Sequence, residues 1–366
     1  MLGVPFCVAK LKEEKNMKKF IALILATSLV ATVLTGCGGS AETKGDSKEV
    51  NVICWSEYVP DETVAGFEEA TGIKVNMTTY NSPDEMLAKV QTSGAGTYDF
   101  ILCPENYTPI FKSEDIIEPL DMSKLPNSAN IAKGYLGRIN DPANEYSLPY
   151  MFAGVCIAVN RDVITDEING YADIIKPEYA DTMIAIEDSR AMYAMAAMAG
   201  GYEANDTSDA ALASVEDYWS KLFPNIHAFD GASPKTLMIN GECPMGLLYI
   251  AEALLAQKEV PSIECIYPEE GVYLGADCMM ITKDGANKDN GYAFFNYILD
   301  AEASAGITEI FPYINPNEKA LEILGAEYQD NILTNPPEDV LARTCTLVDI
   351  GEEQSKIVDL WTKLKG

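Results

Sequence analysis

Apolar runs alternate with amphipathic segments along most of the chain. Between residues 50 and 103 this pattern predicts strands at Val50–Cys54, Lys74–Tyr80 and Tyr98–Cys103, and helices over Asp61–Thr71 and from Ser82 onward. Strands that alternate with helices in this way are typical of an α/β protein built on a parallel sheet.

The second predicted helix has a clear start and end. Ser82, Pro83 and Glu85 stand at the N-cap, first-turn and capping-box positions, and Gly94 follows as a stop signal. The helix should therefore begin directly after Ser82.

The same alternation resumes after Tyr150. Strands are expected at residues 154–159 and 183–186, and a helix at residues 191–200. Met192, Met195 and Met198 lie at helical spacing in that helix. Such a stripe is compatible with an adaptable ligand surface, but methionines more often fill gaps in a core, so we predict core packing.

Residues 18–37 are typical of a bacterial lipoprotein export signal. Lys18 and Lys19 precede a short apolar stretch, and the segment ends in Leu-Thr-Gly-Cys at Cys37, the expected site of cleavage and lipidation. A simple hydrophobic anchor helix is the alternative. If the segment is an export signal, Met17 is the natural start and residues 1–16 are an extension. Residues 38–49 would then form a flexible tether.

The chain is strongly acidic. It has 56 acidic and 26 basic residues, a formal net charge of −30, which makes nucleic acid an improbable partner and favours the approach of small cations. With 366 residues, of which 48% are hydrophobic, the chain is long enough for two cores of ordinary domain size.

Seven cysteines follow the lipidation site: Cys54, Cys103, Cys156, Cys243, Cys265, Cys278 and Cys345. None forms a CxxC pair, and most lie in apolar runs, where a free thiol behaves as a small buried hydrophobe. An exported protein with free thiols suggests a reducing habitat, and one or two disulfides are the alternative.

Recognisable catalytic motifs are absent from the sequence. His227 is the single histidine, and no P-loop, GxGxxG, HExxH, GxSxG or EF-hand pattern occurs, so we expect no metal and no cofactor. The enzymatic alternative that remains is a lipid-anchored hydrolase with paired carboxylates. An exported, tethered, two-domain α/β chain without a catalytic set indicates ligand capture rather than catalysis.

The segment Cys54–Pro60, with the sequence CWSEYVP, resembles the W-[ST]-[ED]-Y start of the spermidine/putrescine-binding proteins of ATP-driven polyamine importers. Further segments match that family in the same order. They are Phe67–Val75, Tyr98–Asp99, Leu120–Pro126, Tyr146–Tyr150, Lys176–Tyr179, Tyr267–Gly271 and Trp361–Lys365. The resemblance covers essentially the whole chain after the export signal.

This resemblance implies a two-lobed, periplasmic-binding-protein-like fold of type II, hinged by crossover segments, with the ligand in a cleft between the lobes. One lobe would span residues 50–153 and 277–320, and the other residues 154–276 and 321–366. The implied function is capture of putrescine or spermidine by a monomer on the outer face of the membrane, and delivery to the permease and ATPase of an ABC importer. Alternatives are another small cationic or organic ligand, or a sensory receptor subunit.

The resemblance also implies the ligand-binding residues. They are Trp55, Ser56, Glu57, Tyr58, Tyr107, Asp188, Tyr249, Asp277 and Tyr313. Asp188 and Asp277 would neutralise ammonium groups, while the rings enclose the methylene chain with cation–π contacts of about 0.5–2 kcal/mol each. Taken singly, Asp188 is more typical of a helix cap than of a ligand contact, while Trp55 and Tyr313 are equally typical of core aromatics.

Three positions depart from the family pattern. Where spermidine binders commonly have an acid, a tryptophan and a glutamine, this chain has Ala191, Gly275 and Leu347. These differences put one ammonium contact and one stacking wall in question, with Glu105, Glu187 and Glu252 as alternative acids. They favour a shorter or less charged amine.

Overall fold

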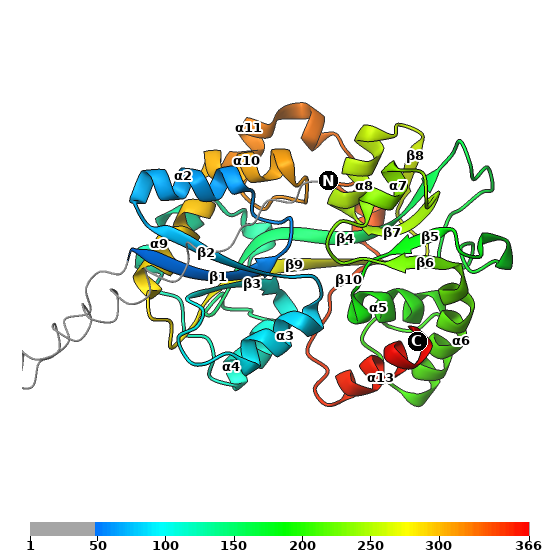
Figure 1. Ribbon diagram of the computed structural model, residues 1–366, viewed down its shortest axis with the longest axis horizontal. Coiled ribbons are helices and arrows are strands. Elements are labelled where there is room, and N and C mark those ends of the chain that lie inside the picture. Colours follow the sequence, from blue (N-terminus) through cyan, green and yellow to red (C-terminus); the bar gives the residue numbers. More distant parts are fainter. Residues whose placement is uncertain (1–47, 366) are drawn as a thin grey trace, which may run out of the picture. The chain divides into compact units, whose positions relative to one another are not determined.

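The computed structural model describes residues 48–365 (Figure 1). The export signal, Cys37 and all but the last two residues of the predicted tether lie outside the described residues. No helix within residues 48–365 is both long enough and apolar enough to cross a membrane.

The strands of the described part join in one ten-stranded sheet with the order β2-β1-β3-β9-β4-β7-β5-β6, while β10 pairs with β9 and β8 with β4. Their bounds are β1 Glu49–Trp55, β2 Lys74–Tyr80, β3 Phe100–Pro104, β4 Leu148–Asn160, β5 Met183–Ala185, β6 Ile226–Phe229, β7 Met245–Tyr249, β8 Ile263–Ile266, β9 Val272–Ile281 and β10 Thr344–Cys345. The α/β class is confirmed.

Helices lie above and below the strands of this sheet (Figure 1). Their bounds are α2 Asp61–Thr71, α3 Pro83–Thr92, α4 Thr108–Ser113, α5 Ser189–Ala199, α6 Asp209–Leu222, α7 Lys235–Ile239, α8 Ile250–Glu259, α9 Lys288–Ile298, α10 Ala301–Ile310, α11 Glu318–Gln329, α12 Glu338–Leu341 and α13 Glu353–Lys365.

The sheet is mixed, so the expectation of a parallel sheet is only partly correct. β1 pairs in parallel with β2 and β3, and β5 pairs in parallel with β6 and β7. The long strands β4 and β9, which run through the middle of Figure 1, are antiparallel to each other, and β9 is antiparallel to β3. The chain crosses the centre of the sheet once in each direction, which forces this antiparallel pairing.

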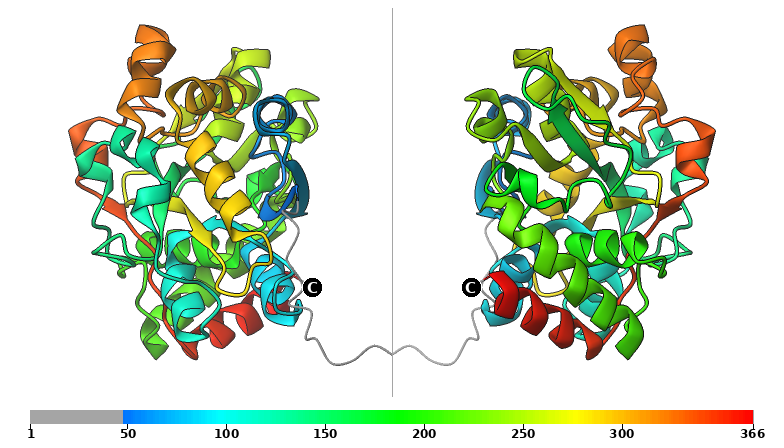
Figure 2. Two further views of the ribbon diagram at one scale, coloured as in Figure 1. Left: turned by 90° about the vertical axis from the view of Figure 1, so that its left-hand side faces the viewer. Right: turned by 90° about the vertical axis from the view of Figure 1, so that its right-hand side faces the viewer.

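The structure has two hydrophobic cores, and the central strand β4 contributes residues to both. In the first, the rings of Phe67 and Phe100 pack edge-on against Phe294, with centroids 5.1 and 5.6 Å apart. In the second, α13 lies beside α5 and α6 (Figure 2), and Trp361 packs against Trp219 at 5.5 Å. The larger core also takes in residues from both predicted lobes, and the lobe limits stay a prediction.

The methionines of α5 belong to the second core. Met192, Met195 and Met198 are all buried there, which confirms the prediction of core packing. The seven cysteines that follow Cys37 in the sequence are free thiols, and five of them are buried.

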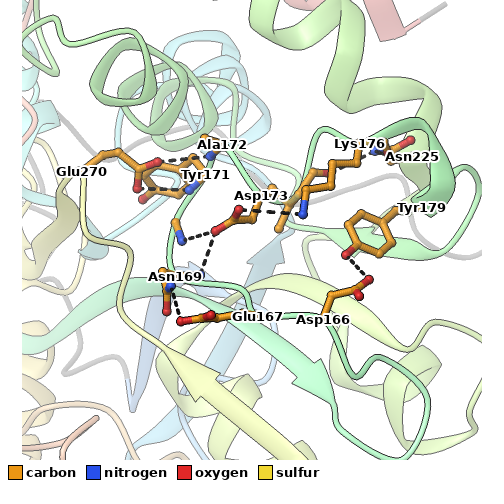
Figure 3. Close-up of polar contacts among 12 residues, drawn as sticks. Asp166, Glu167, Asn169, Tyr171, Ala172, Asp173, Lys176, Tyr179, Asn225 and Glu270 are labelled. Carbon is orange, nitrogen blue, oxygen red and sulfur yellow. Dashed lines mark hydrogen bonds and ion pairs between the residues drawn. The ribbon is translucent and has the colours of Figure 1, made fainter.

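A long connection between β4 and β5 is held by polar contacts rather than by strand pairing (Figure 3). The Glu270 carboxylate accepts hydrogen bonds from the backbone N–H groups of Tyr171 and Ala172, both at 3.1 Å. The Tyr179 hydroxyl donates to Asp166 Oδ2 at 2.8 Å. Two of the segments that carry the family resemblance, Lys176–Tyr179 and Tyr267–Gly271, therefore contribute to one structural cluster away from the pocket described below.

Candidate ligand-binding site

A pocket opens beside the last residues of β1, β3 and β7 and the middle of β9. The centres of water-sized molecules have about 30 Å³ in it, and the space between atoms, about 540 Å³, includes open solvent. Seven of the predicted ligand-binding residues line it: Trp55, Ser56, Glu57, Tyr58, Tyr249, Asp277 and Tyr313. The other lining residues are Pro104, Ala153, Asp230, Gly231, Ala232, Pro234, Glu252 and Tyr273.

Asp277 is a buried lining carboxylate and has no ion-pair partner among the described residues. It sits in β9 opposite Pro104 of β3, and only 6% of its surface is exposed. The Tyr58 hydroxyl donates to its Oδ2 at 2.6 Å and the Trp55 indole N–H to its Oδ1 at 3.3 Å. A buried carboxylate held by two neutral donors presents its negative charge to the pocket.

Burial raises the pKa of Asp277 to about 7, against the opposing effect of the hydrogen bonds from Tyr58 and Trp55. The negative charges of Asp188 and Glu105 add to the increase. Burial likewise raises the pKa of Tyr58 well above its usual value, so its hydroxyl keeps its proton and remains a donor. A cation beside Asp277 would remove most of the cost of ionising it.

Aromatic rings form the walls around this carboxylate. The Trp55 and Tyr249 rings meet edge-on with centroids 6.2 Å apart. Tyr58 and Tyr313 meet in the same way at 5.1 Å. Such faces suit the methylene groups and the polarised C–H and N–H edges of an amine.

Asp188 lies behind this wall rather than on it. Its Oδ1 caps α5 by accepting the backbone N–H groups of Arg190 at 3.0 Å and Ala191 at 2.9 Å. Its Oδ2 accepts the Tyr249 hydroxyl at 2.7 Å. The helix-cap interpretation of Asp188 is therefore correct, and its carboxylate acts on the pocket through Tyr249.

Tyr107 also lies outside the pocket lining. It ends a short 3₁₀ turn after β3, is buried, and packs 6.1 Å from the Phe111 ring. Burial and the nearby charges of Asp84 and Asp188 raise its pKa well above the usual value. Contact between Tyr107 and a ligand remains a prediction.

The three departures from the family pattern are filled by apolar packing. Ala191 and Leu347 are buried in the second core. At Gly275, a Cβ would lie 2.5 Å from the Tyr273 hydroxyl, so the Tyr273 side chain occupies the space that a larger residue would need. Tyr273 also lines the pocket, whereas Ala191, Gly275 and Leu347 do not.

Lys235 is the feature that sequence reasoning missed. It begins α7, and its ammonium contacts Glu57 Oε2 at 2.7 Å and both Glu252 oxygens at 3.1 Å. Glu57 and Lys235 are 178 residues apart in sequence, so no local pattern links them. Glu57, predicted as a ligand contact, and Glu252, considered as a compensating acid, thus share an internal cation.

No cluster of three or more His, Cys, Asp or Glu side chains within residues 48–365 is arranged to hold a metal ion. The lining of the pocket combines carboxylates with aromatic rings.

Comparison with known proteins identifies relatives that are all solute-binding proteins. The family model for bacterial extracellular solute-binding proteins matches residues 62–336. A spermidine/putrescine-binding periplasmic protein of Salmonella typhimurium is 29% identical over 95% of this chain and 99% of its own. Spermidine/putrescine-binding periplasmic protein 1 of Haemophilus influenzae is 30% identical over 92% of this chain and 96% of its own.

Solved structures agree with these relatives. One from Listeria monocytogenes superimposes with a TM-score of 0.84 at 28% identity, covering 87% of this chain and 99% of its own. The spermidine/putrescine ABC transporter substrate-binding protein PotD of Streptococcus pneumoniae gives a TM-score of 0.73 at 27% identity, covering 87% of this chain and 98% of its own. These matches confirm the periplasmic-binding-protein-like fold and a binding role without catalysis. The chain belongs to the family of bacterial extracellular solute-binding proteins.

Proposed function

We propose that this chain captures a polyamine, putrescine or spermidine, outside the cytoplasmic membrane and delivers it to the permease and ATPase of an ABC importer. It acts as a monomer, anchored by lipid at Cys37 with residues 38–49 as the tether. The relatives that are named for spermidine and putrescine support the ligand class. The export-signal pattern of residues 18–37 supports the anchor.

The observation that carries the proposal is the environment of Asp277. A buried carboxylate with a raised pKa and no cationic partner among the described residues is unfavourable in the empty pocket. An ammonium group supplies the missing charge, and the rings of Trp55, Tyr58, Tyr249 and Tyr313 enclose the carbon chain. The Asp188 carboxylate lies behind Tyr249, accepts its hydroxyl hydrogen bond, and adds negative charge near the pocket.

A ligand panel tests the proposal. Melting of the full chain is followed with putrescine, spermidine, spermine, cadaverine, amino acids and sugars, since a ligand that binds only the folded state raises the melting temperature. We expect stabilisation by the amines alone. Stabilisation by a sugar or an amino acid without any effect of the amines would contradict the ligand class.

The same panel on Asp277→Asn tests the site. We expect amine affinity to fall about tenfold or more, about 1.4 kcal/mol or more, because the neutral side chain cannot pair with the ammonium. Asp284→Asn is the matched control, since Asp284 is exposed and outside the pocket. Unchanged affinity in Asp277→Asn would remove Asp277 from the site.

A further inference from the structure

We propose that Lys235 occupies a second ammonium subsite of the pocket, between Glu57 and Glu252, so that a ligand ammonium that binds there must displace an internal one. Lys235 is then a specificity-determining residue that reduces the advantage of diamines over monoamines. This inference rests on the proposed function, because it assumes that the pocket binds amines.

The contacts of Lys235 are those that an ammonium ligand would make. Its Nζ lies 2.7 Å from Glu57 Oε2, 3.1 Å from each Glu252 oxygen and 2.9 Å from Ser233 Oγ. The Lys235 side chain is 16% exposed and that of Glu252 only 7%. Two carboxylates and a hydroxyl therefore surround one largely buried ammonium.

Three separate segments bring these groups together. Glu57 follows β1, Lys235 begins α7, and Glu252 lies on α8, against which α7 packs. Glu57 has a left-handed backbone with φ of 49°, which is uncommon for a residue with a Cβ and adds a local cost. A non-glycine residue held in this conformation aims its carboxylate at Lys235, and both acids line the pocket.

Charge explains why this subsite differs from Asp277. Burial raises the pKa of Glu252, and the Lys235 ammonium opposes that effect. Glu57 and Glu252 are thus already paired, while Asp277 has only the neutral donors Trp55 and Tyr58. A ligand ammonium gains a full ion pair at Asp277, but at Glu57 and Glu252 it only exchanges one ammonium for another.

Alternative charges near the subsite do not change this comparison. Asp230 also lines the pocket, but its Oδ1 accepts the backbone N–H groups of Ala232 and Ser233 and fixes that loop. Asp188 is held by the α5 N-terminus and Tyr249, outside the lining. Lys235 is the only basic side chain that the described residues place on the Glu57–Glu252 pair.

Two amines with the same four-carbon chain isolate the effect. Butylamine has one ammonium group, and putrescine has two. Both are titrated calorimetrically into the full chain and into Lys235→Met, which keeps most of the side-chain length but removes the charge. Lys258→Met is the matched control, because Lys258 is exposed on α8 and outside the pocket.

We expect the putrescine-to-butylamine affinity ratio to rise about tenfold or more in Lys235→Met and to stay unchanged in Lys258→Met. Adding Glu252→Gln to Lys235→Met should remove most of that gain. Lys235→Gln provides a second neutral variant if the methionine variant does not fold.

An unchanged ratio in Lys235→Met or Lys235→Gln, with both amines still bound, would overturn the role of Lys235 and leave the proposed function intact. Failure of the parent chain to bind any amine would instead overturn the proposed function, and the role of Lys235 with it.

Discussion

At the scale of single residues, the burial of Asp277 makes its carboxylate unfavourable to ionise, and a bound cation would reduce that free energy. Its carboxylate is buried and bonded only to Tyr58 and Trp55. Because its usual pKa is 3.8 and burial raises it to about 7, the folded state holds more protons at this site than the unfolded chain between about pH 4 and pH 7. The ligand-free chain therefore loses stability as the pH rises through that window.

Asp277→Asn should remove this loss. We expect the variant to gain stability over the parent chain as the pH rises from about 4 to about 8, by at most about 4 kcal/mol, which is the free energy of a pKa change from 3.8 to about 7. Thermal or urea unfolding of both chains without ligand, across that range, measures the difference. Asp284→Asn should follow the parent chain, and a difference for Asp277→Asn that did not grow with pH would contradict the assigned burial.

Residue-scale prediction from the sequence had a clear limit. The family resemblance of the W-S-E-Y segment predicted Trp55, Ser56, Glu57 and Tyr58 as ligand-binding residues, and all four line the pocket. Lys235 was missed because its pairing with Glu57 exists only after the chain has folded.

At the scale of elements, the sequence predicted those helix and strand ends that depend on neighbouring residues. Ser82 caps α3 by accepting the Glu85 backbone N–H at 3.1 Å, as the sequence predicted, although the Glu85 carboxylate turns to the Asn81 N–H instead. The start of β4 at Leu148 was missed because Pro149 lacks a backbone donor, and the strand accommodates it at a register shift between Pro149 and Met151.

The loop before α7 closes the pocket by a close approach to another segment. A Cβ on Gly231 would lie 1.7 Å from the backbone oxygen of Asn81, which follows β2, so only glycine fits there. Gly231 also lines the pocket. The approach therefore keeps this loop over the ligand space.

Gly231→Ala should push the loop away from Asn81 and open the pocket. We expect amine affinity to fall about tenfold, about 1.4 kcal/mol, with a smaller effect on unfolding, because the clash lies between two loops rather than in a core. Titration calorimetry and thermal melting check both parts. Gly306→Ala, where a Cβ meets nothing within 4 Å, should leave affinity unchanged. Equal affinities for Gly231→Ala and the parent chain would contradict the closing role of the loop.

At the scale of the whole molecule, the pocket forms where chain segments from distant parts of the sequence meet. Strand β9 pairs with β3 and β4, and its residue Asp277 contacts Trp55 at the end of β1. This contact depends on the order of the strands in the sheet and not on a local sequence pattern. Composition and the strand-helix alternation therefore predicted the α/β class but not the mixed sheet. The net charge of −30 favours a cationic ligand in general, while the proposed roles of Asp277 and Lys235 would set how many ammonium groups the pocket accepts.

The most direct test is the structure of the chain with putrescine or spermidine bound. The account predicts a ligand nitrogen within about 4 Å of an Asp277 carboxylate oxygen, with the rings of Trp55, Tyr58, Tyr249 and Tyr313 around the carbon chain. A bound amine whose nitrogens all lie away from Asp277, with that carboxylate still bonded only to Trp55 and Tyr58, would contradict it.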